Sequence, residues 1–293
     1  MQRYFSDIKV EIIEKSFKKE NFEYPKTALI SFFDDKNNKT SEEKFGYVDS
    51  KFIEEYIKKN SELQLDYAYI EQFDLNFLKL KISSKKVILT NFSASNAFFN
   101  NKESDINFSN VLFETKTTNF NNTCFLCNTL DFSSSSFFSE FIDFSNTYFN
   151  CTYINFSKTK YSEADISFKN AVFSEGIKDF QNIEFPVGKK SFVNVDFNDG
   201  DVLFTDTKFN SGPISFKVSN FGTGRVDFAR VHFGKDETSF EKVVFGDGDI
   251  SFRSADFQNG KINFTSSEYG NGKKSFINTN FGDGNIYFKN SIV

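Results

Sequence analysis

The side chains best suited to chemistry are few in this sequence. The only histidine is His232, in the run Val-His-Phe at 231–233. A Ser-His-Asp or Cys-His mechanism needs a nucleophile and an orienting group beside the base, and the residues around His232 show no such signature. We interpret it as an ordinary surface residue. No GxxxxGK[ST] or GxGxxG motif occurs in a strand–helix context, so we expect neither enzyme activity nor a cofactor.

Three cysteines, Cys124, Cys127 and Cys151, form a second group with chemical potential. A zinc site needs four ligands, and no histidine or fourth cysteine lies nearby, so we predict no metal site. Cys127 and Cys151 are 24 residues apart, and the repeat described below places them on neighbouring coils, about 5 Å apart at Cα. We interpret the cysteines as fortuitous, with a labile disulfide or a metal as alternatives.

Gly-Asp runs form the third group, as GDGD at 246–249 and NDGD at 198–201. Calcium-binding β-roll repeats need an Asp in a regular nine-residue repeat, whereas Asp is irregular here. Gly, Asn and Asp are also the residues that adopt positive φ in tight bends. We therefore interpret these runs as corners of the chain rather than as calcium ligands.

These groups are embedded in a regular pattern of large aromatic residues. Phe accounts for 43 of the 293 residues, and from Phe108 to Val293 an aromatic recurs with gaps that alternate between five and seven. Only Tyr161, Tyr269 and Val293 replace Phe in this pattern. A small or β-branched residue stands two positions before almost every aromatic, and a polar residue stands between them. Each small–polar–large triplet predicts a short strand with two side chains inside and one outside.

The odd gaps predict a coil with corners. Residues an odd number apart lie on opposite faces of a straight strand, so the chain must turn between successive aromatics to keep them all inside. Strands of a hairpin meander would be too short to hold their register. We therefore predict a quadrilateral coil of about 24 residues, with wide Gly- and Asn-rich corners at the seven-residue gaps. One inward column of this core is Phe132, Phe156, Phe180, Phe204, Phe228, Phe252 and Phe276.

The repeat resembles the pentapeptide-repeat family. The motif of small residue, Asp or Asn, and Leu or Phe is matched by ADFQN (255–259), TNFGD (279–283) and INFSK (154–158). The resemblance covers roughly residues 87–293 and implies an all-β right-handed quadrilateral parallel β-helix. This chain departs from the family pattern through two extra residues at every second corner and through Phe in place of mostly Leu. We therefore expect a larger coil with bulging corners.

The aromatic pattern is missing from the N-terminal part, which predicts two domains. Residues 1–86 indicate a small α+β capping or docking domain, and residues 87–293 form the β-helix, beginning with a ragged coil. Within the first domain we expect strands at 27–33 and 63–70. We also expect a helix at 49–60, capped by Asp49 or Ser50, with Phe52, Tyr56 and Ile57 on one face.

Two parts of the outer surface are candidate interaction sites. One outward column on the coil contains Asp131, Asp179 and Asp227 among Asn, Ser and Leu. The simpler interpretation is a set of hydrogen bonds between coils, and the alternative is a partly acidic stripe facing a partner. At the other end, the sequence stops within the aromatic repeat, at Phe288 and Val293, and we expect no capping helix there. Because open strand edges invite association, we expect an end-to-end homodimer or docking onto another protein there.

These features favour a non-enzymatic scaffold that presents a rigid surface to another protein, as repeat solenoids commonly do. The resemblance implies an alternative, a DNA mimic that binds and modulates or protects a type II topoisomerase. The net charge of −5 argues against direct nucleic-acid binding. No stretch is apolar enough to span a membrane, and the charged N-terminus does not resemble a signal peptide. We therefore expect a cytoplasmic protein without membrane contact.

Overall fold

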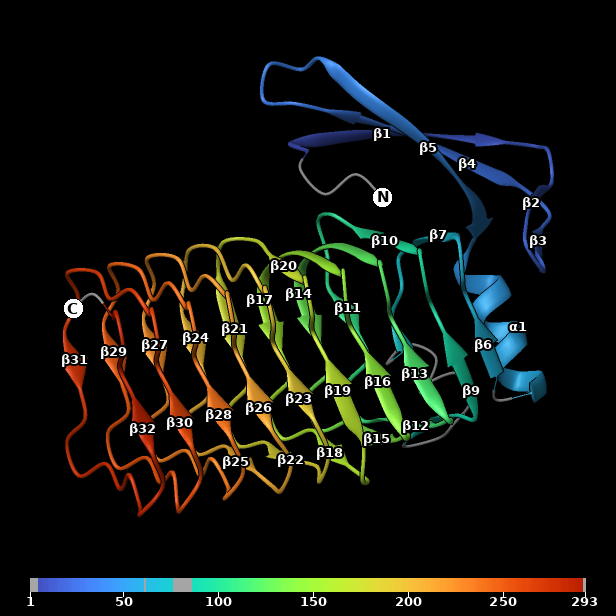
Figure 1. The fold of residues 1–293 in the computed structure, drawn as a ribbon. Helices are drawn as coiled ribbons and strands as arrows, with labels where there is room; N and C mark the ends of the chain where they lie inside the picture. Colours follow the sequence, from blue (N-terminus) through green and yellow to red (C-terminus); the bar gives the residue numbers. More distant parts are fainter. Residues whose placement is uncertain (1–4, 61, 76–85, 292–293) are drawn as a thin grey trace.

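The computed structural model describes residues 5–60, 62–75 and 86–291. The chain forms a right-handed quadrilateral parallel β-helix of about ten turns with about 24 residues each, preceded by a small α+β domain (Figure 1). The predicted fold class and coil length are therefore confirmed.

The N-terminal domain consists of five strands and a helix. In chain order these are β1 (Asp7–Ile13), β2 (Phe17–Lys19), β3 (Phe22–Tyr24), β4 (Thr27–Phe33), β5 (Lys39–Val48) and α1 (Ser50–Asn60). The antiparallel strands β1, β4 and β5 form one sheet, and β2 pairs with β3. The end of β5 pairs in parallel with the first coil, so this sheet continues into the β-helix.

The four sides of the coil are made of short parallel strands, which we number one to four in the order of the inward columns that start at Phe108, Phe113, Phe120 and Phe125. Side two contains β8 (Val87–Leu89), β12 (Val111–Glu114), β15 (Ser136–Phe138), β18 (Lys160–Tyr161), β22 (Glu184–Phe185) and β25 (Lys208–Phe209). Side three contains β6 (Glu62–Gln64), β9 (Asn91–Ser93), β13 (Thr117–Asn119), β16 (Phe141–Asp143), β19 (Asp165–Ser167), β23 (Lys190–Ser191), β26 (Ile214–Ser215), β28 (Thr238–Ser239), β30 (Ile262–Asn263) and β32 (Ile286–Tyr287).

Sides four and one share a continuous sheet, because two strands run through the corner between them. Side four contains β7 (Ala68–Glu71), β10 (Phe98–Asn101) and β20 (Val172–Phe173). The strands that span both sides are β14 (Cys124–Asp131) and β17 (Tyr148–Asn155). Side one contains β11 (Ile106–Asn107), β21 (Ile177–Asp179), β24 (Val202–Leu203), β27 (Val226–Asp227), β29 (Ile250–Ser251) and β31 (Lys274–Ser275).

The aromatic rings form stacked columns inside the coil, as predicted. Along side one, the rings of Phe132 and Phe156 lie 5.0 Å apart and within 3° of parallel, and the same spacing continues to Phe276. Rings of sides one and three also meet edge to face across the centre, as Phe156 and Phe168 do at 90°. Rings such as Phe156 thus have both favourable aromatic geometries, offset-stacked and edge-to-face.

Inward hydroxyl groups satisfy backbone carbonyls in this apolar core. Thr147 donates to the carbonyl oxygen of Phe120 (2.8 Å), Thr207 donates to that of Phe180 (2.6 Å), and Ser219 donates to that of Phe192 (2.5 Å). These small residues lie three positions after a ladder aromatic and reach back to the preceding coil. Since buried polar groups are costly without a partner, this explains why Thr and Ser are tolerated at inward positions.

The tight five-residue corners need a residue with positive φ at every turn, which we expected only at the wide corners. This residue lies two positions after the aromatic and recurs every twelve residues. The residues are Asn110, Asn122, Ser134, Asn146, Lys158, Asn170, Asn182, Asn194, Asp206, Val218, Arg230, Lys242, Ser254, Ser266, Asn278 and Asn290. Asn tolerates this left-handed conformation well, whereas a β-branched residue such as Val218 is an outlier.

The wide corners use glycine for close approach as well as for positive φ. Gly246 has φ of 67°, but two residues later Gly248 has no positive φ. A Cβ atom on Gly248 would lie 1.8 Å from the carbonyl oxygen of Gly224 in the preceding coil. The backbones of successive wide corners are therefore in contact, and only glycine fits between them.

The N-terminal elements agree in part with the expectations. β4 coincides with the predicted strand 27–33, and the backbone N–H of Phe52 donates to Asp49 Oδ1 (2.9 Å), which makes Asp49 the N-cap of α1. The expected helix face is wrong in one residue, because Ile53 and Ile57 pack on the core while Tyr56 is 38% exposed. α1 lies at the N-terminal end of the β-helix (Figure 1), and its Ile53 and Ile57 pack into the core there.

The predicted strand 63–70 is wrong, because this segment already forms a corner of the coil. It is divided into β6 on side three and β7 on side four, with Tyr67 at the corner with φ of 60°. Leu65 takes the place of a ladder aromatic, and Ala68 takes the place of the small inward residue. Strand pairing in the β-helix thus includes residues within the predicted N-terminal domain 1–86.

We expect the substitution Val218→Asn to stabilise the protein by about 1–2 kcal/mol, because it removes the cost of left-handed backbone at a β-branched residue. Val218 is 52% exposed, so little apolar burial is lost. One coil earlier, Asn194 donates to Asn170 Oδ1 (3.0 Å), and an Asn at 218 would extend this ladder. Chemical denaturation measures the change. The matched control, Asn194→Val, should destabilise, and equal stability of all three proteins would contradict the prediction.

Candidate interaction surfaces

The three predicted aspartates lie on side one and close tight corners. Oδ1 of Asp131 accepts the backbone N–H of Ser133 (2.8 Å), and Asp179 and Asp227 do the same with the N–H groups of Gln181 and Ala229 (both 2.9 Å). These bonds lie within a coil, so among the three aspartates the simpler interpretation, hydrogen bonds between coils, is met only by Asp179. Each carboxylate is half-buried, and Asp179 also accepts the hydroxyl of Tyr153 at 2.9 Å.

The last described coil exposes several apolar side chains. Phe288 stacks on Phe264 at 5.0 Å on one side and is 49% exposed. Ile277 and Ile286 are 60% and 37% exposed, so this part of the coil presents an apolar surface. The other residue predicted for this end, Val293, lies outside the described residues.

His232 lies on the surface, as predicted. Its side chain is exposed, and Nδ1 is 3.5 Å from Oδ2 of Asp256 in the next coil. Within the described ranges, no group of three or more His, Cys, Asp or Glu side chains is arranged to hold a metal ion. No helix in the same part of the chain is long and apolar enough to cross a membrane.

The Gly-Asp corners bind backbone amides. Oδ1 of Asp201 accepts the N–H of Arg225 (3.0 Å), and Oδ1 of Asp249 accepts the N–H of Lys273 (2.8 Å), each 24 residues later. Asp247 accepts the N–H of Asn271 (2.9 Å) in the same way. These aspartates connect successive wide corners, so the interpretation of GDGD and NDGD as corner residues is confirmed.

The cysteines are not fortuitous, because Cys127 and Cys151 form a disulfide. Their Cα atoms are 4.8 Å apart in the paired strands β14 and β17, as the 24-residue coil predicts. The third cysteine, Cys124, is buried with a free thiol, and burial raises the pKa of that thiol well above its usual value. Disulfides are rare in cytosolic proteins, so this bond does not support the expected cytoplasmic location.

Two lysines occupy inward positions where the repeat otherwise has small or apolar residues. Nζ of Lys190 donates to the carbonyl oxygens of Asn210 (2.6 Å), Ser211 (2.9 Å) and Gly188 (2.8 Å), all at wide corners. Lys178 donates to the carbonyl of Asp199 (2.6 Å) at the other wide corner. Burial lowers the pKa of each lysine to about 8. The sequence pattern did not predict these sites.

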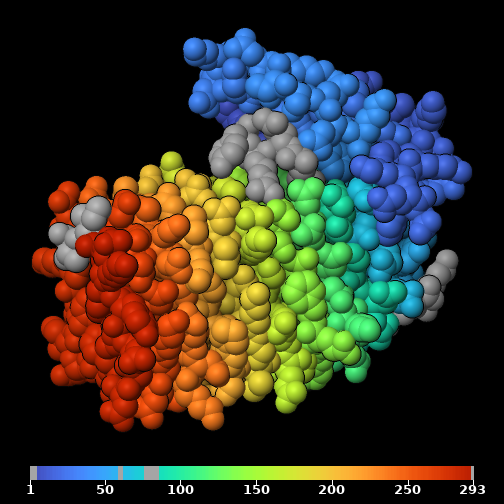
Figure 2. All heavy atoms as spheres, viewed as in Figure 1, coloured from blue at the N-terminus to red at the C-terminus, as the bar shows by residue number. Residues whose placement is uncertain are grey.

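A second feature missed from sequence is an apolar outward column on side four. The outward residues Phe98, Cys124, Tyr148 and Val172 pack under the N-terminal sheet. Residues Ala28, Ile30, Phe32 and Phe45 of β4 and β5 cover them from above. The N-terminal sheet therefore lies along side four rather than over the end of the coil (Figures 1 and 2). The signal in the sequence is that this column becomes polar at Asp196 and Asn220, beyond the cover.

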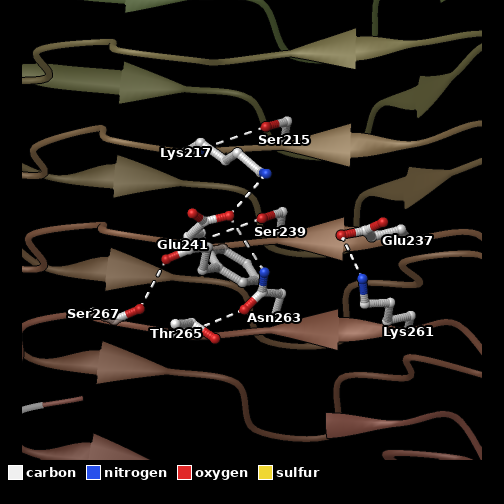
Figure 3. A network of polar contacts seen from close by, with 10 residues as sticks. Ser215, Lys217, Glu237, Ser239, Glu241, Lys261, Asn263, Thr265 and Ser267 are labelled. Carbon is white, nitrogen blue, oxygen red and sulfur yellow. Dashed lines mark hydrogen bonds and ion pairs between the residues drawn. The ribbon is translucent and has the colours of Figure 1, made fainter. Parts of the chain in front are cut away.

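Side three carries ion pairs and hydrogen bonds between coils over its C-terminal half (Figure 3). Lys217 contacts Glu241 at 2.8 Å, and Lys261 contacts Glu237 at 3.3 Å. Asn263 donates to the same Glu241 at 3.5 Å. Exposed pairs of this kind contribute little to stability, but they pair several of the charges on this polar face.

The corner between sides two and three differs, because it exposes aromatic rings beside acidic groups that form no ion pair with other described residues. Phe138 and Phe141 are 49% and 36% exposed, and Ile88 is 43% exposed. Phe138 lines a shallow hollow of about 710 Å³, and Phe141 directly follows the lining residue Glu140. The hollow is lined by Thr90, Glu114, Thr115, Lys116, Phe138, Ser139, Glu140, Ser162 and Glu163. We call this region the phenylalanine hollow.

Comparison of the chain with protein-family models, curated proteins and solved structures finds no match.

The two buried lysines predict that the free energy of unfolding changes with pH in the alkaline range. In the folded protein, Lys178 and Lys190 lose their protons near pH 8, whereas in the unfolded chain they hold them until about 10.5. Between these values the unfolded state binds more protons, so the free energy of unfolding should rise from pH 8 to pH 10. Above pH 10, buried tyrosines such as Tyr24, whose pKa is raised by burial, act in the opposite direction.

Denaturation at several pH values tests this expectation with the variant Lys178→Met/Lys190→Met. The rise between pH 8 and pH 10 should become smaller in this variant, because both titrating groups are removed. Exposed Lys217→Met serves as the control and should keep the wild-type slope. The carboxylates nearest the two lysines, Asp199 and Asp236, remain in all proteins. An unchanged slope in the double variant would contradict the assignment.

The disulfide predicts sensitivity of the fold to reductant. Reduction of the bond between Cys127 and Cys151 should lower the free energy of unfolding by about 3 kcal/mol, the typical value for a closed loop of this size. Denaturation with and without dithiothreitol measures the difference. The variant Cys127→Ser/Cys151→Ser should be insensitive to dithiothreitol, and a wild-type protein equally stable in both conditions would refute the prediction.

Proposed function

We propose that this chain is a non-enzymatic scaffold that binds another polypeptide at the phenylalanine hollow. The observation that carries the proposal is the pair of exposed rings, Phe138 and Phe141, on a rod whose aromatic side chains are otherwise almost all buried. Exposed aromatic residues on a rigid support are typical anchors of protein interfaces. The parallel strands β12 and β15 hold the site, with Glu114 directly opposite Phe138.

The charge of the hollow indicates the chemistry of the partner. Glu114, Glu140 and Glu163 contribute three carboxylates against the single ammonium group of Lys116. None of these four side chains takes part in an ion pair among the residues that the structure describes. A segment with apolar side chains for the rings and Lys or Arg for the carboxylates would match both features.

The rigidity of the support favours recognition without rearrangement. The rings of Phe113 and Phe137, just inside the hollow, stack at 4.8 Å and within 2° of parallel. A backbone hydrogen bond holds this corner to the preceding coil, because the N–H of Glu140 donates to the carbonyl oxygen of Lys116 (3.0 Å). A partner would thus meet a preformed surface, which reduces the entropic cost of binding.

A second contact surface is proposed at the last described coil. Exposed Phe288, Ile277 and Ile286 support docking of a polypeptide there, either a second copy of the chain or a different protein. The DNA-mimic alternative has less support, because the side-one aspartates Asp131, Asp179 and Asp227 are already bonded to their own corners. We also keep a cytoplasmic location as a proposal.

A site-specific crosslinking experiment tests the scaffold function. A photoreactive phenylalanine analogue is placed at position 138 in the full chain, with position 244 as the control, because Val244 is also exposed (38%) but lies away from the hollow. In lysate of the source organism, crosslinks should form from position 138 and not from 244. Mass spectrometry then identifies the partner for purification.

Binding of the purified partner provides the decisive measurement. We expect Phe138→Ser/Phe141→Ser to weaken binding by about 30-fold or more, the effect of losing an aromatic anchor, and Val244→Ser to leave it unchanged. Glu114→Lys should also weaken binding by charge repulsion. Equal crosslinking from both positions, or equal affinity of wild type and the double variant, would overturn the proposed site.

A further inference from the structure

The first strand of the N-terminal sheet has an unpaired edge. All seven residues of β1 (Asp7–Ile13) pair with β4, which begins at Thr27. Across the part of the chain that the structure describes, no strand pairs with the opposite edge of β1. Alternate N–H and C=O groups of an edge strand point away from the sheet, and such an edge is a template for another strand.

The apolar side chains of β1 are less completely buried than those of the neighbouring strand β4. Ile8, Val10 and Ile12 lie opposite Phe32, Ile30 and Ala28, so both sets face side four of the coil. The three β4 residues are fully buried, whereas the three β1 residues are only half-buried. One more strand beyond β1 would bury Ile8, Val10 and Ile12 as β1 buries the residues of β4.

The sequence of β1 is complementary to itself when two copies run antiparallel. With Val10 opposite Val10 of a second copy, Lys9 lies opposite Glu11, and Glu11 lies opposite Lys9. On the other face, Ile8 lies opposite Ile12. Opposite charges directly across a strand pair are favourable, and the arrangement has the twofold symmetry of an isologous dimer.

Neighbouring registers of the same pairing are unfavourable. A shift by two residues in one direction places Glu11 opposite Glu11. A shift in the other direction places Lys9 opposite Lys9 and Asp7 opposite Glu11. Like charges directly opposite each other are destabilising, and a shift by one residue would turn apolar side chains to the wrong face. Among these neighbouring registers, only the one centred on Val10 matches both charge and burial.

The contacts of β1 place its free edge at the margin of side four. Asp7 contacts Lys102 at 2.6 Å, and Lys102 lies at the corner of the coil just after β10 on side four. β1 thus lies toward the margin of side four, and its free edge faces away from β4 and β5. A strand added there would lie beyond the coil of the first copy rather than over its centre.

We propose that the protein forms a homodimer in which β1 pairs antiparallel with β1 of a second copy, in the register centred on Val10. The partner is a second copy, because the alternation of Lys9 and Glu11 with three apolar residues matches itself. This surface is independent of the phenylalanine hollow and of the last described coil.

A charge-swap series tests the pairing on the full purified chain by sedimentation and light scattering over a range of concentrations. The wild type should dimerise. Lys9→Glu and Glu11→Lys should each raise the dimer dissociation constant about tenfold or more, because each places like charges opposite each other twice. The double variant Lys9→Glu/Glu11→Lys should restore dimerisation, although it also loses the contact of Lys9 with the ring of Phe33.

Two further variants separate this dimer from other associations. Val10→Cys should give a covalent dimer on mild oxidation, since residues directly opposite in antiparallel strands lie within reach of a disulfide. Phe288→Ser should leave the dimer intact, which distinguishes it from an end-to-end dimer. A wild type that stays monomeric at all concentrations, single variants that dimerise like wild type, or a double variant that stays as weak as the single variants would each overturn the proposal. Loss of the partner at the hollow would not affect this test.

Discussion

The fold depends on the stacking of aromatic rings in register from one coil to the next. The ring of Phe204 on side one, for example, contacts rings of the coils before and after it at about the strand spacing, and contacts a ring of side three edge to face. Burial of each phenylalanine contributes about 1.5–3 kcal/mol, and four such columns run along the rod. Because a ring can stack only if its coil has the same length as its neighbours, an insertion of one residue would turn a whole side inside out. This constraint explains why the alternation of five and seven continues without an interruption.

The same constraint explains which features were predictable. The spacing determined the coil length, the two kinds of corner and the neighbouring positions of Cys127 and Cys151, since all of these follow from one period. The segment 63–70 is misassigned from sequence because Leu65 replaces the ladder aromatic, and the remaining alternation is equally typical of one straight strand. The need for positive φ at tight corners was missed, because Lys158, Val218 and Arg230 give no indication of it by residue type.

Outward positions were harder to interpret than inward ones. The strand pattern assigns Phe98, Cys124, Tyr148 and Val172 to the outside, and nothing in their spacing shows that another sheet covers them. That cover depends on the path of β4 and β5. Only the last three residues of β5 pair with β7, and the remainder of the two strands lies over the coils. Tertiary arrangement of this kind is not encoded in a local period. The change from apolar residues to Asp196 and Asn220 in this column marks where the covering sheet ends. This signal is recognisable only once the 24-residue coil is known.

In this solenoid, the polar groups at regular positions are bonded to one another. A binding site is therefore expected where the repeat is interrupted. The corner aspartates bind amides, the side-three charges pair, and even the irregular Lys190 is held inside by carbonyl groups. Lys190 shows that a departure from the pattern is not sufficient evidence for a site, since its ammonium group has all its bonds within the molecule. The hollow at Phe138 and the edge of β1 differ from it in one physical respect. Among the residues that the structure describes, the aromatic surface and charge of the hollow, and the backbone edge and half-buried side chains of β1, have no partner. An unmet requirement of this kind is met by water or by a partner, and the exposed apolar surface supports the polypeptide partners proposed above.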